Sequence, residues 1–375
     1  MSIFLSKKEE RILNGEEGEI LQKCYRLLVQ LGEAFGADRL IPIKSVHLSG
    51  ISYQSIGDSG LEFLEEISHQ VKFKVRTTLN PCGMDLRQWR AVGIDESFAE
   101  KQFRILRALK TMGAVMTLTC TPYYLAPPKY GDHLSWAESS AVCYVNSVLG
   151  ARTNREGALS ALASAIAGVT PNFGAHKEEG RKPELLVKVK AKLKSVSDYS
   201  ALGFIVGTQA GNRIPFFKGL KAGAEEMKAI AASLATAGSI PMFHVEGLTP
   251  EWKKQKIVGL EKLEIDLRDI HRIYDEFEGG EGEAVFIGCP HLSVKELHEL
   301  CLKKPKMKTF VCAARGLSPS LFRCLRRSGF IVLHDMCPVV SPLSKKYSKL
   351  VVDSFKAAHY LGERGVLKKR EELVE

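Results

Sequence analysis

The sequence contains no C-x-x-C motif, no apolar run of membrane-spanning length and no N-terminal layout of a signal peptide. The missing C-x-x-C argues against the usual zinc-ribbon and thioredoxin-like sites. A transmembrane helix needs about 20 consecutive apolar residues, and no window approaches that length. Near the start, only Ile3–Leu5 are continuously apolar before charged residues follow. We therefore expect a cytoplasmic protein with no membrane partner.

The cysteines also lack the pattern of a disulfide framework. Their number, nine, is odd in a chain of 375 residues, and they follow no export signal. With 45% hydrophobic residues the chain can bury a large core, and its length predicts two or three domains. Because no C-x-x-C motif is present, any metal that the cysteines bind must be held by sulfurs from distant parts of the chain.

Positive charge is in excess: 53 lysines and arginines face 43 aspartates and glutamates, for a formal net charge of +10. Such an excess fits nucleic acid, an anionic membrane surface or a small phosphorylated or carboxylated substrate. The lysine-rich stretches 181–194 and 302–308 lack interleaved aromatic residues, and no RNA-recognition or zinc-finger pattern is present. The excess permits an anionic partner without naming one, and we expect no nucleic acid. A structural metal-binding or basic RNA-binding protein is the alternative.

Short apolar runs that end in loops rich in Gly, Pro, Asn and Ser alternate with helical patterns along the chain. This alternation predicts α/β layers with largely parallel sheets. The strand-like runs cover residues 44–53, 71–83, 113–123, 202–212, 239–251, 284–293 and 329–342. The helical patterns include residues 60–71, 95–112, 223–238 and 293–304.

Two glycine-rich stretches, 168–184 and 275–284, interrupt these patterns. Stretches of this kind are typical of exposed loops or of joints between domains. They predict three α/β domains, over residues 1–175, 176–278 and 279–375.

Some cysteines lie where strand-like runs end. In open α/β sheets, ligands gather outside the carboxyl ends of the strands. Cys120, Cys289 and Cys337 each follow such a run, and each is followed within two residues by a proline that stiffens the turn. Cys82 also stands at a strand end, so position alone leaves four candidates. The others lie inside a strand-like run (Cys312) or in helical patterns (Cys143, Cys301 and Cys324).

Three converging thiolates fit an iron–sulfur cluster in which one iron keeps an exchangeable position. Such clusters are normally held by four cysteines. A missing fourth cysteine leaves an iron that acts as a Lewis acid on a substrate hydroxyl. A closed zinc site with three cysteines and either His291 or His334 is the competing interpretation, and it predicts a structural role.

The residues around these cysteines resemble the aconitase X family. The similarity is carried by the blocks 119–157, 288–291 (GCPH), 335–343 (DMCPVVSPL) and 351–361 (VVDSFKAAHYL), and it extends over essentially the whole chain. It implies an aconitase-like fold of several α/β/α layers that lacks the swivel domain. It also implies a [4Fe-4S] cluster held by Cys120, Cys289 and Cys337, and it leaves Cys82 out.

The resemblance further implies a hydro-lyase. Archaeal-type members dehydrate (R)-5-phosphomevalonate to trans-anhydromevalonate 5-phosphate for isoprenoid synthesis, and bacterial relatives that dehydrate cis-3-hydroxy-L-proline are the nearest alternative. The family also implies a separate small subunit that corresponds to the swivel domain and supplies a serine base. We therefore expect a heterodimer or a higher assembly with that subunit, and a phosphorylated small-molecule substrate.

Several segments of the first half are expected to contact the substrate. Small residues at 50–52 let backbone N–H groups approach an anion. The tetrapeptide SWAE (135–138) predicts a capping box with Ser135 at the N-cap of a helix and Glu138 at N3. The resemblance implies substrate contacts for Gly50, Ile51, Ser52, Asn80, Pro81, Glu138 and Ser139.

The segment after the third cysteine adds Ser354, Lys356 and Ala357 to the expected substrate site. Lys356 is a candidate phosphate partner that acts as a point charge. Asp353 departs from the family pattern, which more often has asparagine at this position.

Two further pairs are candidates. Arg152 and Arg155 carry planar guanidinium groups that suit phosphate or carboxylate, on a substrate, a neighbouring side chain or the small subunit. Asp132 and His133 resemble the Asp–His arrangement that protonates the departing hydroxyl in aconitases, which makes them the candidate catalytic residues of this chain.

Overall fold

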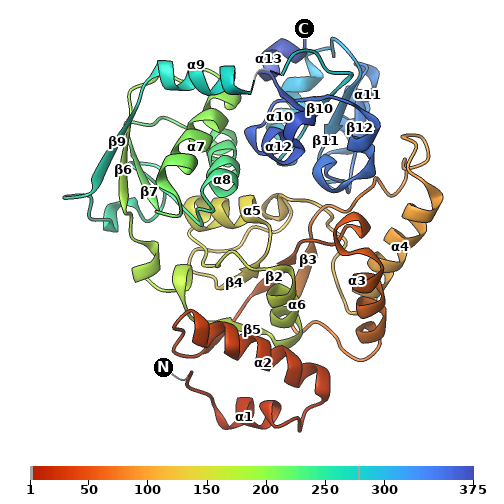
Figure 1. Ribbon diagram of the computed structural model, residues 1–375, viewed down its shortest axis with the longest axis vertical. Coiled ribbons are helices and arrows are strands. Elements are labelled where there is room, and N and C mark those ends of the chain that lie inside the picture. Colours follow the sequence, from red (N-terminus) through yellow and green to blue (C-terminus); the bar gives the residue numbers. More distant parts are fainter. Residues whose placement is uncertain (1–2, 278) are drawn as a thin grey trace.

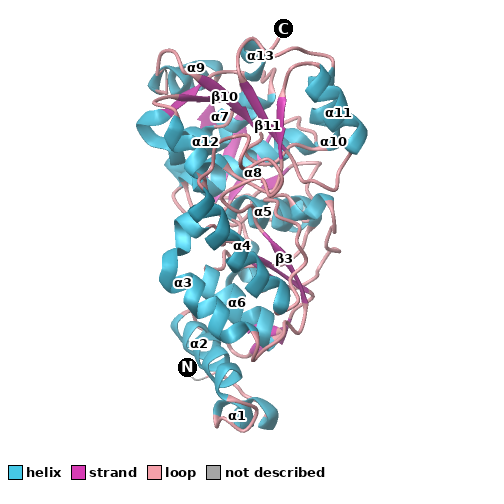
Figure 2. Cartoon of the chain, turned by 90° about the vertical axis from the view of Figure 1, so that its right-hand side faces the viewer, coloured by secondary structure: helices cyan, strands magenta, loops and turns pink. Residues whose placement is uncertain are grey.

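The chain folds into three parts, each built around its own sheet, in the computed structural model of residues 3–277 and 279–375 (Figures 1 and 2). The first part forms the lower half of the molecule in Figure 1, and the second and third parts lie above it. Every strand pair in the three larger sheets is parallel. The prediction of an α/β fold with largely parallel sheets is therefore confirmed.

The first part has a parallel sheet in the order β3-β2-β4 and a separate antiparallel pair, β1-β5. Its strands are β1 (Leu40–Pro42), β2 (Ser45–Leu48), β3 (Arg76–Leu79), β4 (Leu134–Trp136) and β5 (Val169–Pro171). Its helices are α1 (Lys7–Leu13), α2 (Glu19–Ala34), α3 (Tyr53–Ser68), α4 (Glu96–Thr111), α5 (Ser139–Tyr144) and α6 (Ala158–Ala167). Because the strands are parallel, their carboxyl ends meet at one edge of the sheet.

The second part has four parallel strands in the order β8-β7-β6-β9. They are β6 (Leu185–Val189), β7 (Pro215–Lys218), β8 (His244–Val245) and β9 (Glu261–Ile265). The helices are α7 (Val196–Ala210), α8 (Ala224–Ala237) and α9 (Leu267–Glu276). Helices α7 and α8 pack against each other, and α8 also packs on α5, which joins this part to the first.

The third part has five parallel strands in the order β12-β11-β10-β13-β14. They are β10 (Ala284–Ile287), β11 (Thr309–Cys312), β12 (Ile331–Leu333), β13 (Leu350–Val352) and β14 (Gly365–Leu367). The helices are α10 (Val294–Cys301), α11 (Pro319–Arg327), α12 (Phe355–Leu361) and α13 (Arg370–Leu373). The strand β10 is buried along its whole length, as its apolar sequence AVFI requires.

Two of the predicted strands are wrong. Residues 202–210 belong to α7, whose apolar residues are buried on nearly all sides, and a short apolar run alone does not distinguish a strand from a buried helix. Residues 113–119 run beside β3, but Thr117 interrupts the ladder. Its Oγ1 accepts a hydrogen bond from the Leu79 N–H and donates one to the Leu79 carbonyl, both at 2.9 Å. Only an isolated bridge between Thr78 and Val115 remains.

The glycine-rich stretch 168–184 is more ordered than a loop. It contains β5, and Arg181 within it is fully buried in an ion pair with Glu251 at 2.9 Å. The second predicted boundary, at residue 278, lies outside the described residues. The limits of the three domains stay predictions.

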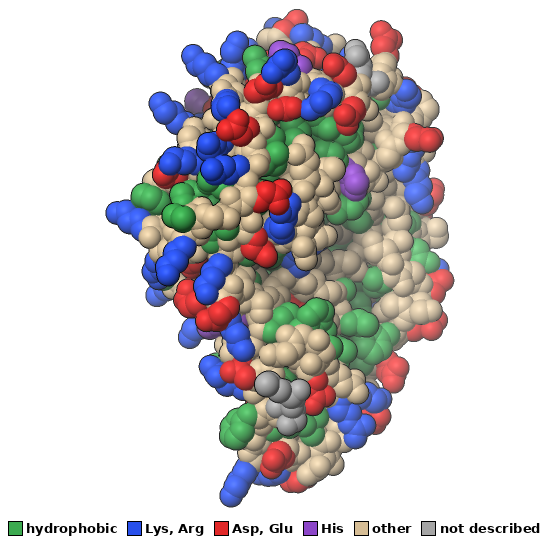
Figure 3. Space-filling model, turned by 60° about the vertical axis from the view of Figure 1, so that its left-hand side comes forward, with side chains coloured by type: hydrophobic (Ala, Val, Ile, Leu, Met, Phe, Trp, Pro, Cys, Tyr) green, Lys and Arg blue, Asp and Glu red, His purple; other side chains and the backbone are tan. Residues whose placement is uncertain are grey.

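One face of the molecule is hollowed across its middle, and hydrophobic side chains gather below the hollow (Figure 3). Figures 1 and 3 differ by a turn about the vertical axis, so the hollow lies at the height where the first part meets the other two. Among residues 3–277 and 279–375, no helix has both the length and the apolar character that crossing a bilayer requires.

Candidate active site

The structure brings Cys120, Cys289 and Cys337 together where the first and third parts meet. Cys289 and Cys337 lie close enough for each to shift the pKa of the other. The backbone N–H of His291 donates to Cys120 Sγ at 3.2 Å. Cys289 and Cys337 follow β10 and β12, and Cys120 follows the stretch beside β3. All nine cysteines, each of them a described residue, carry free thiols.

These three thiols differ from the cysteines packed behind them. Cys120 and Cys289 keep 8% and 7% of their surface exposed and Cys337 is half-buried, whereas Cys82 and Cys312 have no exposed surface. The neighbouring Cys337 sulfur, with burial adding to its effect, raises the pKa of Cys289, and the neighbouring Cys289 lowers the pKa of Cys337. Burial raises the pKa of Cys120 to about 12.

The structure separates Cys82 from the other strand-end candidates. Its thiol donates to the Met84 carbonyl at 3.2 Å, and that of Cys312 donates to the Met336 carbonyl at 3.1 Å. Burial raises the pKa of both thiols. Both cysteines therefore have the surroundings of a structural core residue.

The three sulfurs fit a group with several metal atoms better than a single ion. Among the described residues, no three His, Cys, Asp or Glu side chains are arranged to hold one metal ion. His291 has no nitrogen left for zinc, because Nδ1 contacts Thr119 Oγ1 at 2.8 Å and Nε2 contacts the Met336 carbonyl at 2.9 Å. His334 Nδ1 contacts the Ala313 carbonyl at 2.9 Å. The donor set therefore suits a cluster whose irons each take one thiolate, and it excludes His291 as the fourth ligand of a zinc site.

A buried ion pair lies beside the cysteines. The Lys356 ammonium, on α12, donates to Glu138 Oε1 at 2.5 Å and to Ser140 Oγ at 3.1 Å. Glu138 also accepts from Ser140 Oγ at 2.7 Å and, through Oε2, from Asn80 Nδ2 at 2.8 Å. The positive charge of Lys356 favours the thiolate form of all three cysteines.

The pair is charged at neutral pH. Burial alone would raise the pKa of Glu138, but the charge of Lys356 and the hydrogen bonds from Lys356, Ser140 and Asn80 lower it to about 2. Burial would likewise lower the pKa of Lys356, but Glu138 and the nearby sulfurs raise it. The carboxylate and the ammonium therefore stabilise each other's charged form, as a buried ion pair must.

The prediction of a capping box at SWAE is wrong. Ser135 lies within β4, and Glu138 itself is the N-cap of α5, where its side chain accepts from the Ser140 N–H at 3.4 Å. Ser139 is half-buried, and Ser140, one residue on, makes the contacts to Glu138 and Lys356. The tripeptide ESS (138–140) contains the N-cap that the structure uses. The S-x-x-E spacing from Ser135 to Glu138 favoured Ser135 instead.

Sequence reasoning missed the support behind Asn80. His47 Nε2 contacts Asn80 Oδ1 at 3.3 Å, and His47 Nδ1 contacts Thr78 Oγ1 at 2.8 Å. Burial lowers the pKa of His47 to about 4, so the ring is neutral at pH 7. His47 stands on β2 between β3 and β4, and this position in the sheet is the only signal that points to it.

The loop at residues 50–52 also reaches the cysteine region. Gly50 has φ +69°, a conformation that glycine adopts without strain. Ser52 caps α3 by accepting from the Gln54 N–H at 3.2 Å, and it donates to the Val340 carbonyl at 2.7 Å, just after Cys337. The neighbouring candidates Ile51 and Pro81 are buried.

The segment around Lys356 is held by its own polar contacts. Ser354 caps α12 by accepting from the Ala357 N–H at 3.4 Å. Asp353, which replaces the more usual asparagine, accepts from Arg370 Nε at 2.6 Å. Arg370 therefore supplies a positive charge beside the aspartate that replaces the asparagine of the family pattern.

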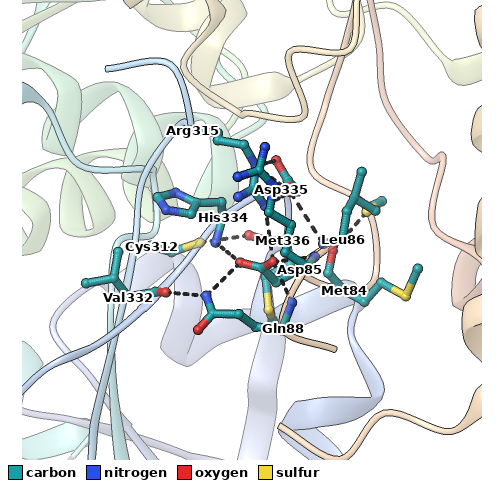
Figure 4. Close-up of polar contacts among 12 residues, drawn as sticks. Met84, Asp85, Leu86, Gln88, Cys312, Arg315, Val332, His334, Asp335 and Met336 are labelled. Atoms are coloured by element: carbon teal, nitrogen blue, oxygen red, sulfur yellow. Dashed lines mark hydrogen bonds and ion pairs between the residues drawn. The ribbon is translucent and has the colours of Figure 1, made fainter. Parts of the chain in front are cut away.

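A second polar network, which the sequence did not indicate, ties the third cysteine segment to the first part (Figure 4). Asp85 and Asp335 share Arg315: Nη2 lies 3.1 Å from Asp85 Oδ1, and Nε lies 3.1 Å from Asp335 Oδ2. Asp85 Oδ2 also accepts from the His334 N–H at 2.8 Å, and Gln88 Nε2 donates to the Val332 carbonyl at 2.8 Å. The network therefore clamps the end of β12, just before Cys337, onto the loop after Cys82.

The structure does not bring Asp132 and His133 to this cluster. They precede β4, at the opposite edge of the sheet from Glu138. His133 Nδ1 contacts His176 Nδ1 at 2.9 Å, and Asp132 Oδ2 accepts from the Lys129 N–H at 2.9 Å. Their positions give no support to the predicted catalytic role, because parallel strands direct their two ends to opposite edges.

The two candidate arginines, Arg152 and Arg155, also lie toward opposite ends of β4. Arg152 lies beside His133, donates to the His176 carbonyl at 3.0 Å and pairs with Glu178. Arg155 is exposed and bridges Trp136, nearer the carboxyl edge. Arg155 alone of the two is free of ion pairs with the described residues.

The fold and the convergent cysteines define an aconitase-like α/β protein, and comparison with known proteins gives its family. Family models of the aconitase X first, second and third domains match residues 2–179, 183–275 and 282–375. The chain belongs to the aconitase X family. A solved structure of Thermococcus kodakaraensis aconitase X in its holo form superposes with a TM-score of 0.92, at 41% identity, covering 99% of this chain and 98% of that one.

The similar curated proteins include phosphomevalonate dehydratase large subunits. That of Methanosarcina mazei is 44% identical over 96% of this chain and 92% of its own length. That of Methanocaldococcus jannaschii is 43% identical over 96% and 95%. The cis-3-hydroxy-L-proline dehydratase of Hypocrea jecorina is 34% identical over 96% of this chain, but only 65% of its own length is matched.

Proposed function

We propose that this chain is the large subunit of a hydro-lyase that dehydrates (R)-5-phosphomevalonate to trans-anhydromevalonate 5-phosphate. One observation carries the proposal: three free thiols meet a buried Glu138–Lys356 pair at the junction of two parts of the fold. Five curated relatives named phosphomevalonate dehydratase large subunit, at 38% to 44% identity, support the choice of substrate.

The cofactor in this proposal is a [4Fe-4S] cluster held by Cys120, Cys289 and Cys337. When bound with one iron free of cysteine, it supplies a Lewis acid for the leaving hydroxyl. The residual exposure of these cysteines supports a ligand that faces a substrate.

Lys356 and Glu138 keep bonding capacity for a substrate. An ammonium has three N–H donors, and Lys356 directs two of them at Glu138 and Ser140. The third is available to a carboxylate or phosphate oxygen. Glu138 Oε2 accepts only from Asn80 among the described residues, which leaves it able to accept from a substrate hydroxyl.

Glu138 binds and orients the substrate but does not take the proton. A carboxylate with a pKa near 2 is a weak base at neutral pH. The resemblance to the family assigns the base to a serine of a small subunit that carries the swivel domain and forms a heterodimer or a higher assembly with this chain. Gly50, Ile51, Ser52, Asn80, Pro81, Ser139, Ser354 and Ala357 complete the proposed substrate site, with Arg155 at its margin.

Anaerobic co-expression with candidate small subunits tests the proposal. The complex is assayed for dehydration of phosphomevalonate and of cis-3-hydroxy-L-proline. We expect turnover of phosphomevalonate; turnover of the imino acid alone would refute the substrate. Replacing Cys120, Cys289 or Cys337 by serine is expected to abolish the visible absorbance of the cluster, and Cys312→Ser is the matched control that keeps it.

A further inference from the structure

His291 touches all three cysteine segments. Its backbone N–H donates to Cys120 Sγ at 3.2 Å. Its ring contacts Thr119 Oγ1 through Nδ1 at 2.8 Å and the Met336 carbonyl through Nε2 at 2.9 Å. Thr119 and Met336 each directly precede a proposed cluster ligand, and His291 lies two residues after the other one. One residue therefore spans loops that come from the first and third parts of the fold.

The partners of the ring define which nitrogen carries its proton. A backbone carbonyl only accepts hydrogen bonds, so Nε2 must be the nitrogen that donates to Met336. Nδ1 is then the acceptor and Thr119 Oγ1 the donor. The Thr119 oxygen accepts in turn from the backbone N–H of Thr121 at 3.2 Å. Each group therefore donates to the next, from the Thr121 N–H through Thr119 Oγ1 and the His291 ring to the Met336 carbonyl. Every donor and acceptor in this series of hydrogen bonds has a partner.

We propose that His291 is a positioning residue that fixes the spacing of Cys120, Cys289 and Cys337 before the cofactor binds. His291 is 1% exposed, so it acts through the loops that it joins and does not touch the substrate. Groups that orient metal ligands in this way commonly change metal affinity 10- to 100-fold when removed. The inference rests on the proposed cluster, but it concerns contacts that exist without it.

Four substitutions test the bonds of the ring. His291→Leu removes the contacts of the ring with Thr119 and Met336, and that of Nε2 with Cys312 Sγ at 3.3 Å, at similar volume. His291→Gln keeps an N–H donor that can reach the Met336 carbonyl, and His291→Asn keeps an acceptor for Thr119. Thr119→Val removes one bond with little change of shape, and remains informative if His291→Leu does not fold. The matched control is His244→Gln, since His244 is equally buried and its Nε2 contacts the Arg181 carbonyl at 2.7 Å in the second part.

The first readout is the state of the cluster in the anaerobic complex with the small subunit. We expect His291→Leu to lose iron in air at least tenfold faster than the unaltered chain and to shift the midpoint potential and the electron paramagnetic resonance signal. The glutamine variant should recover part of the loss, and His244→Gln should behave like the unaltered chain. Equal loss rates and potentials in the unaltered chain and in both His291→Leu and Thr119→Val would overturn the inference.

The second readout needs no cluster. Arsenite, As(OH)₃, condenses with three thiols and releases three waters, so its capture by the cluster-free chain measures how well the three sulfurs are placed in advance. We expect at least tenfold weaker capture by His291→Leu, with the Cys120/Cys289/Cys337→Ser triple variant as the baseline. If the unaltered chain forms no cluster, the proposed function fails while arsenite capture still decides the role of His291. Unchanged capture by His291→Leu would contradict that role.

Discussion

The strand β4 leads to polar residues at both of its ends, and the two groups meet different surroundings. After its carboxyl end, Glu138 is buried against Lys356 from the third part and lies beside the cysteines. Before its amino end, His133 faces His176, next to the partly exposed pair of Arg152 and Glu178. An extended chain places the two ends on the order of 15 Å apart. Strand direction, more than closeness in sequence, decides which polar residues share a site.

The largest expected difference between the two ends is in catalysis. Glu138→Gln removes the counter-charge of Lys356 and displaces the substrate contacts, so we expect kcat/KM for phosphomevalonate to fall at least about 100-fold. His133→Gln and Asp132→Asn at the amino end should stay within about threefold, below the effect of removing a catalytic acid. Steady-state kinetics of the complex with the small subunit measure both. A loss on His133→Gln as large as that on Glu138→Gln would remove the distinction between the ends.

A second expected effect is on stability. Lys356→Met leaves the Glu138 charge buried without a partner, which typically costs about 3–5 kcal/mol. The double variant Lys356→Met/Glu138→Gln removes both charges and should regain most of this loss. Urea denaturation of the isolated chain measures the free energy of unfolding. A single variant as stable as the unaltered chain would mean that water reaches the pair freely.

The pH dependence of stability depends on two buried histidines. His47 lies near the carboxyl end of β4, and His176 lies near its amino end. Burial lowers the folded-state pKa of His47 to about 4 and that of His176 to about 3, below the ordinary value of 6.5. Between these values the unfolded chain binds protons that the folded chain does not. The free energy of unfolding is therefore fully retained above pH 6.5 and falls as the pH drops toward 4, by up to about 1.4 kcal/mol per pH unit for each histidine.

Denaturation at pH 5 and pH 7 measures this slope. His47→Gln and His176→Gln should each reduce it, since either removes one titrating group. Only His47→Gln should also lower activity, because His47 supports Asn80. An unchanged slope in both variants would show that neither histidine is responsible.

The smallest expected effects come from the two arginines. Arg152→Ala loses its ion pair with Glu178, whose side chain is 59% exposed, so we expect a cost of about 1 kcal/mol or less in the free energy of unfolding. Arg155→Ala removes an exposed side chain and should change stability by less than about 0.5 kcal/mol. Arg155 lies nearer the carboxyl edge, so a rise in KM for phosphomevalonate with unchanged kcat would place it at the phosphate.

The sequence predicted that three distant cysteines converge, but it did not predict the contacts that connect their loops. The α/β alternation and the strand ends at Cys289 and Cys337 follow from local patterns that the structure repeats. Cys120 follows no strand, because the Thr117 side chain replaces a backbone partner of β3, and no hydropathy pattern records such a replacement. The contacts of His47, Arg315 and His291 join residues far apart in the chain. Nothing in the local sequence distinguishes His47 or Arg315 from other polar residues beside apolar runs, and His291 stood out only as a possible zinc ligand and as part of the GCPH block.

The clamp of Arg315 between Asp85 and Asp335 has a consequence for how the protein matures. It fastens the stretch before Cys337 to a loop made early in synthesis, while Cys337 itself is made late. A ribosome-bound chain that has emerged only as far as the second sheet holds a single proposed ligand and nothing to dock against it. The three proposed ligands are therefore brought together only after the third sheet has folded.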